Sequence, residues 1–164
     1  MKTIIYIAML SLSLMACTSG KTEQASKTDS SPNEKVSQET SASIPAYMAL
    51  KDALVQTDAV TAKSAASDLS STLSNENIGE ELIHAANAIA SSDDVAVQRT
   101  QFKIVTDGLI ASLKANGTED GVYVQYCPMA FDNTGANWLS MSDEIRNPYF
   151  GDMMLKCGKV EEKL

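Results

Sequence analysis

The chain has 164 residues, which leaves room for one domain and accessory segments. Its 13 basic and 21 acidic residues give a formal net charge of -8, and the basic residues form no stripe. This charge pattern argues against a nucleic-acid partner. The sequence also lacks the glycine-rich phosphate-binding motifs and the HExxH pattern of zinc proteases.

Residues 1–16 have the organisation of an export signal. Lys2 is followed by the apolar run Ile4–Leu14, which is too short to cross a bilayer core of about 30 Å as a helix. The run ends in LMAC, which resembles a bacterial lipobox and makes Cys17 the new N-terminus. We therefore expect Cys17 to be lipidated and to anchor the chain to a membrane, facing the periplasm. The alternative is an ordinary cleaved signal peptide in which Cys17 falls here by chance.

Residues 17–43 differ sharply in composition from the rest of the chain. After Cys17 they are mostly Ser, Thr, Lys, Glu and Gln, with one Val and no aromatic residue. Such a segment cannot bury enough apolar surface to offset the entropy of ordering it. We expect a disordered tether that holds the domain roughly 30 Å from its anchor.

Four amphipathic segments follow the tether and predict four helices. Ser43 is the predicted N-cap of the first helix and Asp58 that of the second. Asn75 should begin the third, Ser92-Asp93-Asp94 should open the fourth, and Gly117 should follow its end. The residues predicted to face the core are Tyr47, Leu50, Leu54, Ala62, Ala66, Leu69, Leu73, Ile78, Leu82, Ala85, Ile89, Val95, Phe102, Val105, Leu109 and Leu113. Because the connections are short, we expect a mainly α protein built on an antiparallel four-helix bundle.

The four predicted helices carry no pattern typical of catalysis. His84 is the only histidine, and we expect it at the surface beside the apolar stripe. Arg99 and Phe102 are expected to join the helices to the C-terminal segment, through an ion pair and through packing.

The C-terminal segment, residues 118–164, concentrates aromatic and sulfur-containing residues. Six of the nine aromatic residues lie here, with the methionines Met129, Met141, Met153 and Met154. Val122–Tyr126 alternates like a short strand, and proline and glycine divide the rest into turns. We expect a small irregular cap with at most short strands. It should pack on the bundle at 44–117, so that 44–164 forms one domain.

Cys127 and Cys157 carry the clearest chemistry of this segment. Two cysteines of an exported protein usually form a disulfide, and closing a loop of about 30 residues stabilises by roughly 3–4 kcal/mol. Thiolates and thioethers also favour Cu(I), which makes Met129 and Met154 candidate ligands beside the two cysteines. Met153 is a weaker candidate, because adjacent side chains rarely point at one atom. A disulfide, a metal site, and a pair that cycles between them all remain open.

The segment contains YCPMA, WLS, EIRNPYFG and MLKCG. Together these motifs resemble an uncharacterised periplasmic domain family, which occurs alone in lipoproteins and fused to the adaptor subunits of copper/silver efflux pumps. The resemblance covers roughly residues 44–162, weakly through the helices and strongly through the last forty residues. It implies a role in heavy-metal handling, with an efflux adaptor as partner.

The CPM and CG elements also resemble the short heavy-metal-binding module of the same adaptors. That module usually has a His after CPM and a second Cys-x-x-Cys-Gly-Met knuckle, whereas Ala130 replaces the His here. A four-ligand site of the zinc type is therefore disfavoured. A low-coordinate Cu(I) or Ag(I) site survives, with Trp138 and Tyr149 shielding the ion or simply packing.

Two functions remain open from the sequence. The first is a lipid-anchored periplasmic protein that binds copper or silver or assists its efflux. The second is a protein-interaction module of the cell envelope that is stapled by a disulfide and holds no metal. An enzyme is disfavoured, because the chain has no CxxC motif and no evident acid–base pair.

Overall fold

The computed structural model describes residues 41–117 and 121–164, which lie in one compact unit. The predicted signal segment, Cys17 and most of the predicted tether lie outside the described residues. Within the described ranges, no helix is long and apolar enough to cross a membrane.

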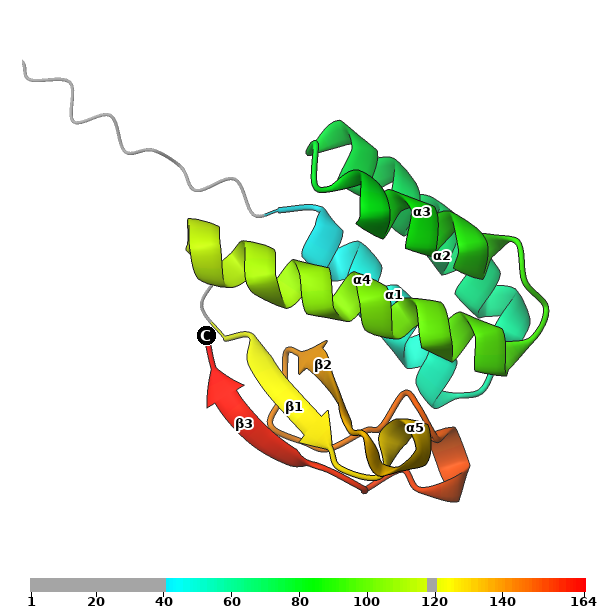
Figure 1. Cartoon of the computed structure of the whole chain (residues 1–164), viewed down its shortest axis with the longest axis vertical. Helices are drawn as coiled ribbons and strands as arrows, with labels where there is room; N and C mark the ends of the chain where they lie inside the picture. The colour runs from blue at the N-terminus through cyan, green and yellow to red at the C-terminus, as the bar shows by residue number, and fades with distance from the viewer. Residues whose placement is uncertain (1–40, 118–120) are drawn as a thin grey trace, which may run out of the picture. The chain divides into compact units, whose positions relative to one another are not determined.

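Four helices are followed by a small antiparallel sheet, as Figure 1 shows. Each helix packs on the next one along the chain, and α4 also contacts β2. The strand order is β2-β1-β3, so that β1 lies in the middle. The elements are α1 (Ser43–Val55), α2 (Ala59–Asn75), α3 (Glu80–Ala90), α4 (Val95–Asn116), β1 (Tyr123–Cys127), α5 (Ala130–Asn133), β2 (Ala136–Ser140), η1 (Gly151–Met153) and β3 (Lys159–Lys163).

Three of the predicted helix boundaries are confirmed. The Asp58 carboxylate accepts the N–H groups of Val60 and Thr61, and Asp94 accepts that of Ala96. These contacts satisfy N–H groups that have no partner within the helix. Gly117 follows the last residue of α4 with a φ of 93°, a conformation that glycine adopts without strain.

The prediction that Ser43 caps the first helix is wrong. Ser43 is the first helical residue, and the N-cap residue Ala42 makes no side-chain cap. The Glu76 carboxylate accepts the N–H of Ala42 at 2.7 Å and that of Ser43 at 3.3 Å. The end of α2 thus caps the start of α1.

The predicted start of the third helix at Asn75 is also wrong. Asn75 is the last residue of α2, and α3 begins at Glu80 after a turn in which Asn77 has a φ of 55°. Glu80 and Glu81 then occupy the first turn of α3, where the helix dipole favours negative charge.

The C-terminal segment is more regular than the irregular cap that the sequence predicted. Its three strands have five residues each, and β1 pairs with β2 from Tyr123↔Ser140 to Cys127↔Ala136. The third strand, β3, was not predicted, because KVEEK has no apolar alternation and is exposed throughout. It forms because β1 offers it an open edge for hydrogen bonds.

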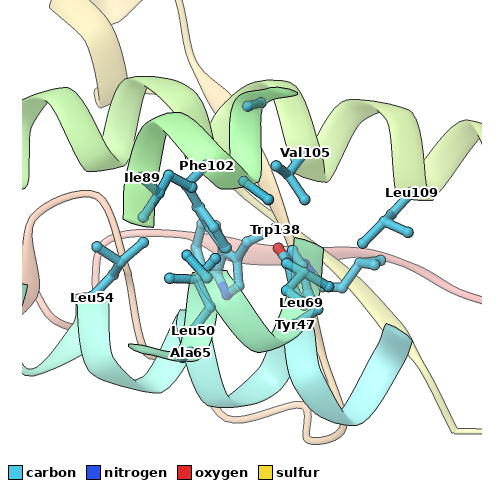
Figure 2. Close-up of a cluster of buried hydrophobic side chains, with 14 of the residues drawn as sticks. Tyr47, Leu50, Leu54, Ala65, Leu69, Ile89, Phe102, Val105, Leu109 and Trp138 are labelled. Carbon is cyan, nitrogen blue, oxygen red and sulfur yellow. The ribbon is translucent and has the colours of Figure 1, made fainter. Parts of the chain in front are cut away.

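A buried aromatic cluster joins the helices to the sheet. Figure 2 shows Trp138 of β2 in the same buried cluster as side chains of the helices such as Leu50 and Phe102. Phe102 stacks on Tyr47 with ring centroids 5.0 Å apart and meets Tyr149 at 5.8 Å. The expected packing role of Phe102 is therefore confirmed.

Tyr47 also makes a polar link between the helices and the sheet. It is fully buried on α1, and its Oη accepts the N–H of Leu139 on β2 at 3.1 Å. The same oxygen lies 2.8 Å from the Thr106 hydroxyl of α4. Burial raises the pKa of the Tyr47 phenol far above its usual range, so the group stays neutral.

Candidate functional site

Cys127 and Cys157 lie side by side. Their Sγ atoms are 2.8 Å apart, and both residues are free thiols. Cys127 is the last residue of β1 and is fully buried, whereas Cys157 precedes β3 and is partly exposed. Because β1 and β3 are neighbours in the sheet, two cysteines 30 residues apart meet at one end of it.

Asn147 holds the turn that carries Cys157. It is fully buried, and its Nδ2 donates to the Cys157 carbonyl oxygen at 2.8 Å. Its main-chain N–H donates to the Leu155 carbonyl oxygen at 2.9 Å, while its Oδ1 accepts the N–H of Tyr149 at 2.8 Å. The Asn147 side chain therefore holds the loop at Tyr149 and at Cys157. This explains the asparagine of the NPYFG motif.

Gly158 lets the cysteine approach the sheet. A Cβ atom at this position would lie 2.7 Å from Cη2 of Trp138 and 2.9 Å from the carbonyl oxygen of Tyr126. Its φ of 147° is also one that a side chain rarely adopts. Only glycine fits directly after Cys157, and this accounts for the CG motif.

Arg99 ties the same loop to the helices. Its Nε donates to the Pro148 carbonyl oxygen at 2.8 Å, and its Nη2 donates to the Leu54 carbonyl oxygen at 3.2 Å and the Thr57 hydroxyl at 3.0 Å. The expected link is confirmed. The expected ion pair is wrong, since the partners found among the described residues are two carbonyls and a hydroxyl. Desolvation lowers the pKa of Arg99 from its usual value.

Gly151 lies where this loop comes close to the residues that end α1. A Cβ at Gly151 would lie 2.4 Å from Oγ1 of Thr57 and 2.9 Å from the Val55 carbonyl oxygen. The asparagine and glycines of the C-terminal motifs thus have a shared role, which is to position the segment that carries Cys157.

The two candidate methionine ligands contact Cys157 through their main chains. The main chain of Met129 lowers the pKa of the Cys157 thiol, and the Met154 carbonyl oxygen accepts the N–H of Cys157 at 2.9 Å. The Met129 side chain is 47% exposed, Met154 is half-buried, and Met153 is 76% exposed. Both Met129 and Met154 therefore lie next to the pair with side chains that solvent can reach.

The other two sequence candidates pack in the core. Trp138 is fully buried and Tyr149 nearly so, with their rings edge to face at 6.2 Å. The Tyr149 hydroxyl donates to the Asn137 carbonyl oxygen at 2.5 Å, whereas the buried Nε1 of Trp138 has no hydrogen-bond partner among the residues that the structure describes. His84 is exposed on α3, as predicted.

The hydrogen bond between the two thiols raises the pKa of Cys157 to about 11, and desolvation adds to the shift. At neutral pH this thiol keeps its proton. A metal ion that binds there must displace the proton, so its affinity should rise with pH.

The turn after Cys127 has an unusual backbone that the sequence did not predict. Phe131, Asp132 and Asn133 have φ values of 51°, 56° and 68°, in the left-handed region. Asp and Asn tolerate this conformation, but Phe rarely adopts it. The Phe131 ring packs edge to face on Tyr149 at 5.3 Å, and this contact offsets part of the strain.

The described residues hold few hard metal ligands in one place. Across 41–117 and 121–164, no group of three or more His, Cys, Asp or Glu side chains is positioned to hold a metal ion. A metal at the cysteine pair would need a thioether or an external ligand as its third donor.

Comparison with known protein families locates a match on the helices. The family model is described as "Protein of unknown function (DUF3347)", and it matches residues 44–121. A DUF3347 domain is present there. The DUF3347 match spans α1 to α4 and stops before β1. It therefore does not cover the C-terminal motifs YCPMA, WLS, EIRNPYFG and MLKCG, which contain both cysteines. No significant match was found to a curated protein or to a solved structure.

Proposed function

We propose that this chain is a lipid-anchored protein of the cell envelope whose Cys127–Cys157 pair binds Cu(I) or Ag(I) in the dithiol state. The observation that supports this most strongly is the pair itself, with sulfurs 2.8 Å apart and one of them open to solvent. Soft thiolates select soft monovalent cations over the harder ions of the periplasm. It is a binding protein and not an enzyme.

Metal binding requires only a small movement of the pair. Metal–thiolate bonds of about 2.3 Å place two sulfurs roughly 4 Å apart. Because Cys127 is fixed in the core, Cys157 must move outward by about 1–2 Å, which a side-chain rotation at this partly exposed turn supplies. Met129 and Met154 flank Cys157 and are the candidates for a third, thioether donor.

The N-terminal segment supports the proposed location. Cleavage before Cys17 and lipidation of its thiol would attach the protein to a membrane, with the domain facing the periplasm. In this proposal the four helices form an antiparallel bundle that docks on a heavy-metal efflux adaptor. The cysteine pair then receives the metal or passes it on.

A second function is favoured by the sulfur separation itself. The distance of 2.8 Å is closer to a disulfide bond of about 2.05 Å than to a metal-bridged pair. In an oxidising compartment the pair would close into a disulfide. The protein would then be a stapled interaction module with no metal.

Competition titration with a chromophoric Cu(I) chelator separates the two functions. The full chain is titrated before and after thiol reduction, alongside variants with Cys127→Ser or Cys157→Ser. One tightly held equivalent that appears only after reduction, and that either substitution abolishes, is the expected result. If the protein does not compete with the chelator for Cu(I) in either redox state, the disulfide-stapled interaction module is the remaining function.

The methionine ligands are tested in the same titration. Met129→Leu or Met154→Leu should weaken Cu(I) binding, because leucine preserves volume and removes the donor. Met141→Leu is the matched control, since Met141 is 51% exposed, about as exposed as Met129. If all three substitutions change the Cu(I) affinity equally, the thioethers of Met129 and Met154 are not ligands.

A further inference from the structure

The two sulfurs of the pair differ in how solvent can reach them. Cys127 is 0% exposed and belongs to the hydrophobic core, while Cys157 lies in a partly exposed turn. Thiol–disulfide exchange needs the attacking thiolate to approach one sulfur in line with the bond that breaks. A thiolate from solvent can approach Cys157 with Cys127 behind it. The opposite approach would have to pass through the core.

We propose that the pair exchanges with external thiols through Cys157 alone, and that its redox partner is a dithiol oxidoreductase. This inference rests on the proposed function, because it describes how the metal-binding dithiol is regenerated. The partner is defined by its chemistry, which is an exposed nucleophilic thiolate with a second, resolving thiol.

The reduction proceeds in two balanced steps. The partner thiolate attacks Sγ of Cys157, a mixed disulfide forms, and the Cys127–Cys157 bond breaks. The electron pair leaves on Cys127, which takes a proton from water. The second partner thiol then attacks the partner sulfur of the mixed disulfide and releases Cys157. One disulfide is reduced as the partner dithiol is oxidised, and oxidation of the pair follows the reverse path.

Two contacts at the turn fit this assignment. The main-chain N–H of Met129 favours the thiolate form of Cys157 and can stabilise negative charge that develops there in either direction. Asn147 holds the Cys157 carbonyl, so the turn keeps its place when the sulfur changes partners. Cys127 is held in β1, opposite Ala136, and stays within reach to resolve the mixed disulfide.

A trapping experiment tests the proposal on the full chain carrying Cys17→Ser, so that two thiols remain. The oxidised protein is mixed with a thioredoxin that lacks its resolving cysteine, and the trapped mixed disulfide is mapped by mass spectrometry. We expect at least nine-tenths of the adduct on Cys157. Adducts on Cys127, adducts shared equally, or no adduct would each overturn the proposal.

A matched pair of single-cysteine variants provides a second measurement. Reduced Cys127→Ser, which keeps Cys157, should react with glutathione disulfide at least tenfold faster than reduced Cys157→Ser. Circular dichroism confirms that both variants are folded, and equal rates in folded variants would contradict the proposal. Cu(I) affinity of the reduced wild-type chain is measured separately. If the reduced chain binds no Cu(I) but exchange is selective for Cys157, only the proposed metal-binding function is contradicted. If the chain binds Cu(I) but exchange occurs equally at both cysteines, only this inference is contradicted.

Discussion

The Asn147 side-chain amide donates to the main-chain carbonyl oxygen of Cys157 at 2.8 Å, across a loop of ten residues. This contact places the accessible thiol of the pair, because Asn147 is itself locked by hydrogen bonds to Leu155 and Tyr149. The arrangement makes the asparagine of NPYFG a positioning residue for the thiol site.

Replacing Asn147 with Ala should lower the free energy of unfolding by about 2–3 kcal/mol, because it leaves the buried N–H of Tyr149 and the part-buried carbonyl of Cys157 without their partner. It should also slow disulfide formation in the reduced protein, since Cys157 loses its anchor. Urea denaturation and free-thiol titration measure the two effects. Asn75→Ala is the control, since Asn75 is exposed at the end of α2 and should shift stability by less than about 0.5 kcal/mol.

Gly158→Ala should destabilise the sheet by about 2–4 kcal/mol, because its Cβ would collide with Trp138 and with the Tyr126 carbonyl. The near-ultraviolet circular dichroism of Trp138 should change as well. Gly117→Ala separates collision from backbone strain, since Gly117 also has a positive φ but no atom of residues 41–117 or 121–164 lies within 4 Å of the added Cβ. Equal losses in the two variants would show that strain alone accounts for the effect.

Arg99→Met should cost about 2–3 kcal/mol of stability, because the Pro148 and Leu54 carbonyls and the Thr57 hydroxyl lose their donor. Arg99→Lys should recover only a small part, since one ammonium group cannot reproduce the guanidinium fork. Thermal denaturation compares both with Arg146→Lys at an exposed position. Full recovery in Arg99→Lys would mean that charge, and not geometry, is what the site requires.

Much of the helical layer could be predicted, because its signals are local. The spacing of Leu69 and Leu73 and the caps at Asp58 and Asp94 depend on residues a few positions apart. The cap of α1 could not be predicted from neighbouring residues, because Glu76 lies 34 residues along the chain from Ala42. The predicted Ser43 cap is wrong because a tertiary contact replaced a local one.

The sequence predicts which residues form the candidate site, but it does not predict how they are arranged in space. Cys127 and Cys157 stand out by type, yet their approach depends on β3, a strand with no apolar pattern of its own. The charge of Arg99 predicts an ion pair, because charge is visible in a sequence while the carbonyls that Arg99 binds are not. The sequence marks Asn147 only as part of the NPYFG motif, because its role depends on the folded loop.

The pH dependence of the reduced pair tests the thiol contact directly. The pKa of Cys157 is raised to about 11, chiefly by its hydrogen bond to Cys127. A raised folded-state pKa stabilises the reduced protein below the unfolded value of about 9, and this stabilisation is lost as pH rises from there through 11. Ultraviolet absorbance of the thiolate, recorded against pH, should show Cys157 titrating near 11. In Cys127→Ala the midpoint should fall toward 9, because the partner thiol is gone. An unchanged midpoint would mean that burial sets the pKa, and that the two sulfurs are not in contact in solution.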